Sequence, residues 1–291
     1  MTTTLSAPVL DGTIPCSHRM ANHWRSENFN FAADRIAARD VEAVVPGVAR
    51  AARASATFER RVLEHLANAE VGQVVHLGHG YPTPTAEGGL DWERVQDRQP
   101  GTPVVLVSTD STVYTQSEAL VHASAPVVTL RQDHLSATVL DHPQVQSVID
   151  PTRSVAVLLT SLHHQQPAPD LTALVTGLAT RLAPGSLIAL SHLAAPARRT
   201  RHRLTRLMNQ TTRGRWGKVR APGDIAALLL GLERVGSRPG DVAAWTADGH
   251  TPPAAQRLPS TGPAPRVIEY GGVVRVPHTG LRPQARRAAA L

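Results

Sequence analysis

The sequence predicts an α/β fold in which a doubly wound parallel sheet carries helices on both faces and follows a helical extension. Two observations lead to this prediction. Five short apolar runs recur between residues 73 and 192, and each is nearly continuous, as in strands buried on both faces. Helical patterns separate these runs, and the alternation of strand and helix is typical of a parallel sheet.

The helical extension is predicted from two patterns near the start of the chain. Residues 1–30 are polar and irregular, and helices are expected over residues 30–45 and 47–69, separated at Pro46-Gly47. In the second helix, Val48, Phe58, Val62 and Leu66 recur at helical steps, as in an amphipathic helix that covers a sheet. Residues 1–70 are therefore expected to form the extension.

The sheet domain is expected to occupy residues 71–277. Its strands are predicted at 73–78, 103–108, 126–131, 154–161 and 185–192, with a last strand within 266–277. Helices are predicted at 111–123, 136–149 and 170–182, and a helical stretch at 221–235 runs toward a further strand. Residues 250–265 are a Pro-rich connector, and residues 278–291 are expected to be a disordered tail.

Composition restricts the class of protein. At 291 residues the chain is long enough to bury a large core, and its single cysteine, Cys16, excludes an intramolecular disulfide and a Cys-rich zinc site. The start of the chain lacks the basic and apolar segments of a signal peptide. No apolar run reaches the roughly 18 residues that a membrane-spanning helix needs. We therefore expect a cytoplasmic protein without a membrane partner.

The formal charge of +7 is concentrated in one segment. Residues Ala197 to Arg220 contain no acidic residue, and Lys218 within them is the only lysine of the chain. Such an Arg-rich segment can bind nucleic-acid phosphates, but a solvent-exposed Arg-rich helix is the simpler interpretation. Nucleic acid is therefore a possible partner but not the favoured one.

The turn after the first strand is the first place to look for a ligand site. In open parallel sheets, ligands bind beyond the carboxyl ends of the strands. This turn reads His76-Leu77-Gly78-His79-Gly80, and glycine lets the backbone approach a ligand closely. The third glycine of the dinucleotide-binding motif is absent, so the pattern alone also fits an ordinary tight turn.

Four segments together carry a family resemblance: NFAADR (Asn30 to Arg35), HLGHGYPT (His76 to Thr83), PGSLIALSH (Pro184 to His192) and YGGVVRVP (Tyr270 to Pro277). They resemble the S-adenosylmethionine-dependent methyltransferases of the actinobacterial DUF574 family, in the same order, from about residue 17 to residue 277. The resemblance implies a class I methyltransferase, Rossmann-like fold with a seven-stranded, mostly parallel sheet whose final strand is antiparallel. It also implies S-adenosyl-L-methionine as cofactor.

The resemblance assigns site residues position by position. Gly78 and Gly80 match the family's glycines beneath the cofactor, and Asp110 matches the second acid after the second strand. Asp133 matches the acid near the adenine. The Leu-His pair of the family after the fourth strand is matched by either His163 or His164, both of which are candidates for a catalytic base.

The chain departs from the family pattern at three cofactor-facing features. His76, Leu77, Gly78, His79 and Gly80 stand where the family reads D-I-G-T-G, so the acid of that turn is missing. Ser108 replaces the acid that holds the ribose. Residues 26–29 replace a Gly-Gly-Lys-Asp segment. The full set of expected cofactor contacts is nevertheless His76, Gly78, His79, Gly80, Ser108, Asp110 and Asp133.

These residues favour an enzyme that transfers a methyl group to a small-molecule acceptor, largely through proximity and orientation. Two alternatives stay open: a degenerate relative that acts as a binding or regulatory module, and a nucleic-acid-associated protein on the same scaffold. No metal is expected, because His76/His79 and His163/His164 lack the spacing of a helical ligand pair. The sequence names neither the acceptor nor the oligomeric state.

Overall fold

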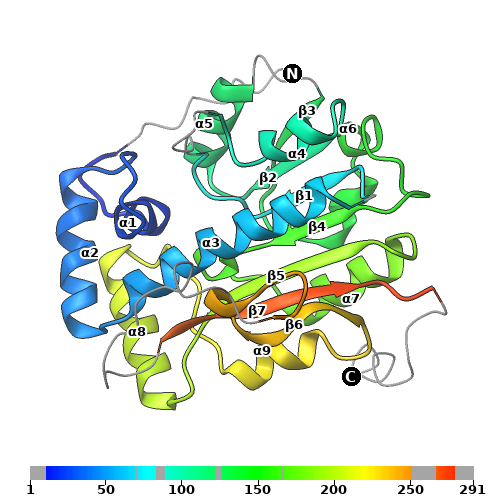
Figure 1. Ribbon diagram of the computed structural model, residues 1–291. Helices are drawn as coiled ribbons and strands as arrows, with labels where there is room; N and C mark the ends of the chain where they lie inside the picture. Colours follow the sequence, from blue (N-terminus) through cyan, green and yellow to red (C-terminus); the bar gives the residue numbers. More distant parts are fainter. Residues whose placement is uncertain are drawn as a thin grey trace.

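The computed structural model describes residues 11–69, 71–82, 89–121, 126–165, 167–250 and 267–278. Within them, seven strands form one sheet in the order β3-β2-β1-β4-β5-β7-β6 (Figure 1). Neighbouring strands from β3 to β5 are parallel, and β7 runs antiparallel to both β5 and β6. The predicted seven-stranded, mostly parallel sheet with an antiparallel final strand is confirmed.

All five strands predicted before residue 200 are present, each within two residues of its predicted start. The strands are β1 Val74–Leu77, β2 Val104–Ser108, β3 Val127–Arg131, β4 Ala156–Leu159, β5 Leu187–Ala194, β6 Glu233–Asp241 and β7 Ile268–Arg275. The described residues of β1, β2, β4 and β5 are buried throughout, as their continuous apolar pattern predicts.

Helices connect the strands and precede them. The α-helices are α1 Ser17–Trp24, α2 Ala32–Val44, α3 Val48–Ala67, α4 Glu93–Arg98, α5 Ser111–Val121, α6 Pro143–Gln146, α7 Leu171–Arg181, α8 Arg198–Thr211 and α9 Pro222–Leu228. The 3₁₀ turns are η1 Ala137–Asp141, η2 Leu162–His164 and η3 Val242–Ala244.

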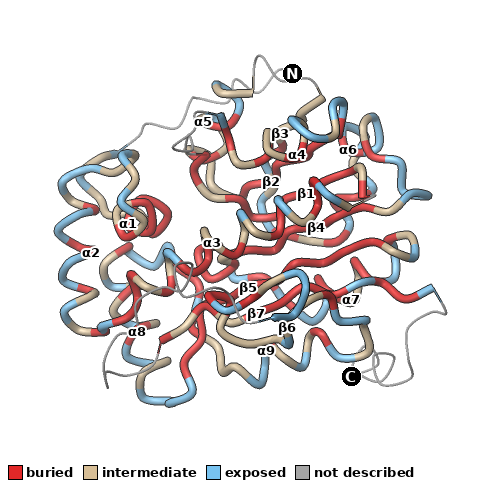
Figure 2. Tube along the Cα trace, in the orientation of Figure 1, coloured by how far each residue is buried: buried red, intermediate tan, exposed pale blue. Residues whose placement is uncertain are grey.

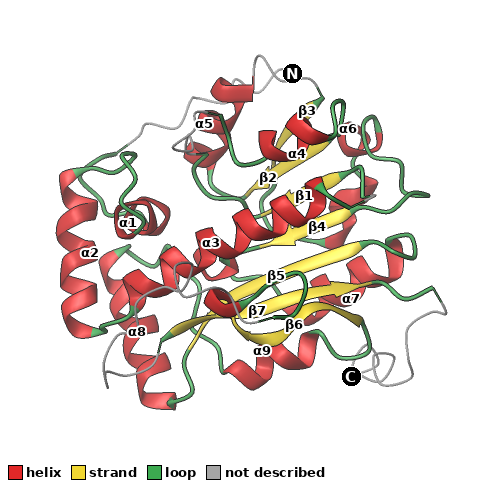
Figure 3. Cartoon of the chain, viewed as in Figure 1, coloured by secondary structure: helices red, strands yellow, loops and turns green. Residues whose placement is uncertain are grey.

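Two apolar clusters lie on opposite faces of the sheet, because successive residues of a strand point to opposite sides. On one face, Val75 and Leu77 of β1 pack with η1, α6, α7 and α9. On the other, Val74 packs with α3, α4 and η3, and α3 crosses in front of the sheet in Figure 3. His76 shares the face of Val74, which directs its side chain toward α3.

A third cluster lies at the carboxyl edge of the sheet. It joins α1, α2, the start of α3 and α8 to Leu193 of β5, and these helices gather at the left of Figure 1. The outer sides of α2 and α8 are exposed, whereas the central strands β1, β2, β4 and β5 are buried throughout (Figure 2). The N-terminal helices therefore sit over the edge where a ligand site is expected.

Three local predictions differ from the structure. The helix expected over residues 221–235 ends at Leu228, and β6 begins at Glu233. Residues 1–30 were expected to be irregular, but α1 forms within them. Its buried residues include the polar Ser17, His18 and Arg19 beside Met20 and Trp24, so the apolar residues alone do not mark the helix. The single helix expected over residues 136–149 is instead η1 followed by α6. Ser136 caps η1 and Pro143 starts α6, since proline cannot continue a helix but is favoured at its first position.

The described residues leave three expectations untested: the connector, the C-terminal tail and the domain division. Most of the connector (251–266) and of the C-terminal tail (279–291) lie outside the described residues. The division at residue 70 stays a prediction; α3, on the N-terminal side of it, contributes Phe58, Val62 and Leu66 to the cluster that covers the sheet.

In the described part of the chain, no helix combines the length and apolar character needed to cross a membrane.

Candidate functional site

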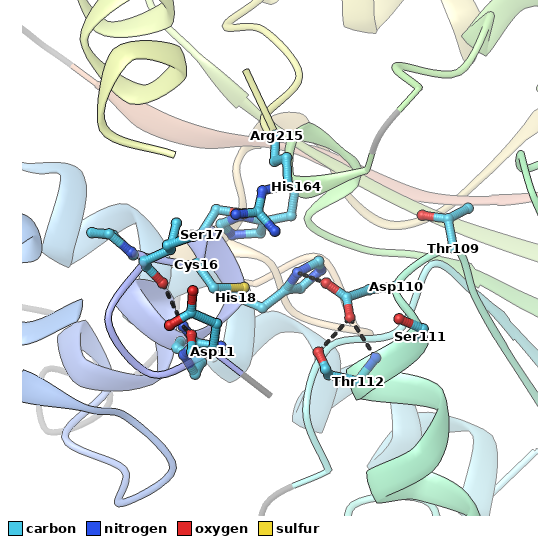
Figure 4. A pocket seen from close by; sticks show the side chains of 13 residues that line it. Asp11, Cys16, Ser17, His18, Thr109, Asp110, Ser111, Thr112, His164 and Arg215 are labelled. Carbon is cyan, nitrogen blue, oxygen red and sulfur yellow. Dashed lines mark hydrogen bonds and ion pairs between the residues drawn. The ribbon is translucent and has the colours of Figure 1, made fainter. Parts of the chain in front are cut away.

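A cavity of about 350 Å³ opens at the carboxyl edge of the sheet. Its walls come from the start of α1 (Cys16 and His18), from the turn after β2 (Asp110 and Thr112) and from His164 after β4 (Figure 4). Arg215, which follows α8, lies at the upper rim of that view. The cavity thus lies where open parallel sheets place their ligands.

A buried ion pair fixes α1 over this edge. Arg19 Nε donates to Asp34 Oδ2 at 2.7 Å, and the backbone nitrogen of Cys16 donates to Asp34 Oδ1 at 2.8 Å. Asp34 is fully buried and also accepts from the backbone nitrogen of Phe31 at 2.9 Å. This carboxylate, part of the NFAADR segment, therefore ties the beginnings of α1 and α2 together and sets the position of Cys16 and His18.

Gly78 has the backbone conformation expected of a glycine turn. Its φ of +81° lies in the left-handed region, which side chains disfavour. A Cβ atom there would lie 2.9 Å from Leu135 Cδ1 and 3.1 Å from Gln165 Cδ. Gly80 has more room, since a Cβ atom would lie 3.8 Å from His18 Cδ2. Only Gly78 is therefore closely covered, and the covering atoms belong to this chain.

Gln165 lies across the strand ends above Gly78. Its amide nitrogen donates to the carbonyl oxygen of Gly78 at 3.0 Å and to His18 Nε2 at 3.4 Å. Its amide oxygen accepts from Thr109 Oγ1 at 2.8 Å. Gln165 is fully buried, so one side chain connects the turns that follow β1, β2 and β4 with α1.

His79 points away from the cavity, between β2 and α5. Its Nδ1 donates to the carbonyl oxygen of Val107 at 3.1 Å, and its Nε2 accepts from Ser117 Oγ at 2.7 Å. Burial, reinforced by the nearby His76, lowers the pKa of His79 to about 3. The neutral ring therefore links β2 to α5 through its two hydrogen bonds.

His76 faces α3, and its ring centroid lies 6.0 Å from that of His79. Its Nε2 donates to Thr160 Oγ1 at 3.0 Å, and the Thr160 hydroxyl donates to Glu59 Oε2 at 2.7 Å. Burial lowers the pKa of His76 to about 3 and raises the pKa of Glu59. A small cavity of about 60 Å³ adjoins them, and burial next to Glu59 raises the pKa of Asp91 in its wall to about 6.

Ser108 and Asp110 close the turn after β2. Ser108 is fully buried, and its Oγ accepts from the backbone nitrogen of Asp110 at 3.1 Å. Asp110 Oδ1 caps α5 by accepting from the backbone nitrogens of Thr112 (2.8 Å) and Val113 (3.2 Å). Burial works to raise the pKa of Asp110, but His18 and these hydrogen bonds outweigh it and lower that pKa. Asp110 Oδ2 is the oxygen left to face the cavity.

Asp133 lies apart from the other predicted residues. Its carboxylate is 87% exposed beyond β3, 3.7 Å from Arg131 Nη2, and it does not line the cavity. The structure therefore brings Asp110 and His164 together at the cavity, places Gly78 beneath Gln165, and leaves Asp133 in solvent.

His163 and His164 differ in their surroundings. His163 Nδ1 accepts from the backbone nitrogen of Leu193 at 3.1 Å, which anchors this ring to β5. His164 lines the cavity, and its Nδ1 has no hydrogen-bond partner within the described residues. Burial lowers the pKa of both rings well below the usual value. Both are therefore neutral at physiological pH, and His164 is the one that reaches the cavity.

Cys16, His18 and Asp110 offer one sulfur, one nitrogen and one oxygen within 4.8 Å of one another. This is the one group of potential metal ligands in the described ranges. His18 Nε2 accepts from Gln165, so Nδ1 carries the ring hydrogen and faces Asp110 Oδ2 at 4.0 Å. A metal ion would have to displace that hydrogen.

The Arg-rich segment forms α8 and the loop after it. Leu204 and Met208 are buried against α1 and α2, whereas Arg199, Arg203 and Arg206 are exposed. Arg201 is instead held by the carbonyl oxygens of Ala195 and Pro196. The guanidinium groups of Arg199, Arg203 and Arg206 therefore lie on the outer side of α8, whereas Arg215 in the loop after it lines the cavity.

Sequence reasoning did not single out Gln165, Thr109 or His18. Gln165 directly follows the His163-His164 pair, and Thr109 lies between two predicted contacts, so both belong to turns that the strand pattern had marked. His18 had no such signal, because α1 itself was not recognised.

Comparisons with known proteins agree with this fold. A family model described as S-adenosyl methyltransferase matches residues 3–277. The chain is similar to a protein of known structure from Thermobifida fusca, named as a candidate methyltransferase, with 26% identity and a TM-score of 0.75 over 94% of this chain and 99% of that one. It is also similar to a DUF574 family protein from Streptomyces avermitilis, with 24% identity and a TM-score of 0.72 over 92% and 99% of the two chains. No curated protein matches the chain.

Proposed function

Because this chain belongs to the S-adenosyl methyltransferase family, whose cofactor is S-adenosylmethionine, we propose that it transfers a methyl group to a small-molecule acceptor. Its fold is the class I methyltransferase fold that the resemblance implied. The cofactor supplies an activated methyl group on a sulfonium, so the protein contributes chiefly alignment of the reacting atoms.

The observation that supports this proposal is the cavity at the carboxyl edge. Its volume of about 350 Å³ is within the range of small-molecule sites, and polar groups converge on it from three separate segments. Asp110 Oδ2 and the His164 ring offer it a carboxylate and a neutral imidazole. An acceptor of modest size with hydroxyl or amine groups suits such a lining.

His164 is the residue best placed to take a proton from an acceptor. Its lowered pKa keeps the ring unprotonated, so it can accept a hydrogen bond from a hydroxyl in the cavity. The same low pKa makes it a weak base, which suits an acceptor that is itself acidic, such as a phenol or enol. His163 is a positioning residue, because its bond to Leu193 fixes the turn that presents His164.

The cofactor floor is the surface formed by Gly78 and the adjoining strand-end turns after β1 and β2, on which the cofactor would rest. A cofactor that rests on Gly78 requires open space above that glycine, and Leu135 and Gln165 fill that space. The Ser108 hydroxyl oxygen already accepts a hydrogen bond from the backbone nitrogen of Asp110, and Asp133 points to solvent. As they lie here, these side chains do not fit S-adenosylmethionine against Gly78.

The proposal is tested by incubating the protein with S-adenosylmethionine and a panel of phenols, enols and amines, and by measuring S-adenosylhomocysteine. Formation above the protein-free rate supports methyl transfer. The His164→Gln variant should lose most of that rate while binding the cofactor normally. A folded protein that neither binds S-adenosylmethionine in calorimetry nor forms product would refute the proposal.

A second candidate is a binding module that retains the fold without transferring a methyl group. The observation that favours it is the closed floor, in which Gln165 covers Gly78 and Ser108 replaces the ribose-binding acid. Such a protein would bind a small molecule in the cavity but form no S-adenosylhomocysteine with any acceptor. The same incubation therefore separates the two functions.

A further inference from the structure

We propose that the Gln165 side chain fills the space above Gly78 in which the cofactor would lie, and that S-adenosylmethionine binds only after this side chain moves away from Gly78. This inference rests on the proposed function, because it concerns the same cofactor site. It assigns Gln165 a role that the resemblance did not: the residue controls access to the floor.

The contacts of Gln165 carry the inference. The side chain uses its amide nitrogen and oxygen on Gly78 and Thr109, two groups of the strand ends on which a ligand of this fold would rest. It also contacts Gly78 directly, since its Cγ and Cδ lie 3.2 and 3.1 Å from the Cβ position of that glycine. Gln165 therefore occupies the space and also takes the hydrogen-bonding groups of the floor.

The backbone that presents Gln165 is held in place on both sides. Ser161 begins the turn after β4 with a φ of +52°, and its Oγ lies 2.6 Å from Ser55 Oγ on α3. On the outer side, the backbone nitrogen of Gly217 donates to the carbonyl oxygen of His163 at 3.1 Å. These contacts hold the backbone at Ser161 and His163, so we take the side chain as the part of Gln165 that gives way to a ligand.

The neighbouring cavity gives the side chain a place to go. Thr109 and His18, two of the partners of Gln165, are also part of the cavity wall. A rotation of the Gln165 side chain about its own bonds would open the floor to the same cavity that receives the acceptor. The apparent affinity for cofactor then equals the intrinsic affinity multiplied by the fraction of molecules in the open state.

The test compares three proteins by calorimetric titration with S-adenosylhomocysteine: wild type, Gln165→Ala and Gln73→Ala. Gln73 is a matched control, because it is also a buried glutamine with three polar contacts, to Asp150 and Ser154, at the opposite end of β1. We expect Gln165→Ala to bind at least about tenfold more tightly than wild type, since removing the occupant populates the open state. Gln73→Ala should bind like wild type.

Each outcome is informative. If all three proteins bind equally, Gln165 does not control access, while the proposed methyltransferase function stands. If neither wild type nor folded Gln165→Ala binds, the inference and the proposed function both fail. Tighter binding by Gln165→Ala alone supports both.

A second variant and a second readout guard against a folding defect. Gln165→Asn keeps the amide but is one methylene shorter, so it should release Gly78 and raise affinity in the same direction. In the wild-type protein, the side-chain NH₂ of Gln165 should exchange slowly with solvent in NMR and lose that protection when S-adenosylhomocysteine is added. Retained protection in the saturated complex would overturn the inference.

Discussion

The carbonyl oxygen of His163 lies 3.1 Å from the backbone nitrogen of Gly217, and a Cβ atom on Gly217 would lie 2.7 Å from that same oxygen. The segment after β4 and the loop after α8 are thus in backbone contact at a point where only glycine fits. This contact explains how a loop distant in sequence determines the position of His164 and Gln165.

Replacing this glycine should therefore destabilise the fold. For Gly217→Ala we expect a loss of about 1–3 kcal/mol in the free energy of unfolding, because backbone atoms must move to admit the methyl group. Gly223→Ala is the control: that glycine is exposed in α9 with nothing within 4 Å of its Cβ position, and alanine there should be neutral or stabilising. Denaturant unfolding measures both, and equal stabilities would contradict the clash.

His76 is predicted not to tolerate the acid that the family carries at its position. His76→Asp would remove the hydrogen bond to Thr160 and place a second carboxyl near Glu59, whose pKa burial already raises. We expect the free energy of unfolding to fall by about 1–3 kcal/mol, and we expect this loss to become larger as pH rises. His76→Asn, which keeps a donor and adds no charge, should lose less. Greater stability of His76→Asp at high pH would refute this account.

Stability should also depend on pH through Glu269. It is fully buried and accepts from Ser191 Oγ at 2.7 Å, and burial raises its pKa from 4.5 to about 8. Between these values the folded protein holds a proton that the unfolded chain has lost, so the free energy of unfolding falls as pH rises. From about pH 5 to about pH 8, wild type should lose on the order of 3 kcal/mol relative to Glu269→Gln. Parallel profiles of the two proteins would rule out this contribution.

Much of the fold could be predicted from sequence because strands buried on both faces leave a continuous apolar run. Val104 to Val107 is such a run, Val74 to Leu77 is interrupted only by His76, and no distant residue is needed to recognise either. The predicted helix over 136–149 was wrong because Pro143 begins a new helix there. α1 was not predicted because its buried side chains are largely polar and take partners elsewhere in the chain, as Arg19 does with Asp34.

The site was less predictable than the fold. The turn at Gly78 was located correctly, because its place follows from the strand before it. The directions of His76 and His79 did not follow, since they depend on Thr160, Ser117 and other partners far away in sequence. Likewise, nothing in the local pattern shows that Gln165 folds back onto Gly78. Such contacts are decided by packing, which a single sequence does not display.

The cluster of Cys16, His18 and Asp110 should not retain zinc. To bind zinc, His18 Nδ1 must lose its hydrogen, and in the neutral ring that hydrogen then lies on Nε2. Two donors, this N–H and the Gln165 amide nitrogen, would face each other. We therefore expect far less than one zinc per chain in protein purified without chelators at neutral pH. Elemental analysis measures this directly. Stoichiometric zinc in wild type that is lost in Cys16→Ser would contradict the expectation and establish a metal site.

The exposed arginines of α8 should give at most weak, salt-sensitive binding to nucleic acid. Arg199, Arg203 and Arg206 can contact phosphates but present no base-reading surface, so each should add about one unit to the slope of log affinity against log salt. Replacing all three with alanine should lower that slope by about three units. A variant in which three exposed arginines elsewhere, Arg39, Arg234 and Arg238, are replaced with alanine controls for net charge. Affinity that is unchanged by the α8 substitutions would show that any binding lies elsewhere, because the guanidinium groups that neutralise the phosphates would then be on another surface.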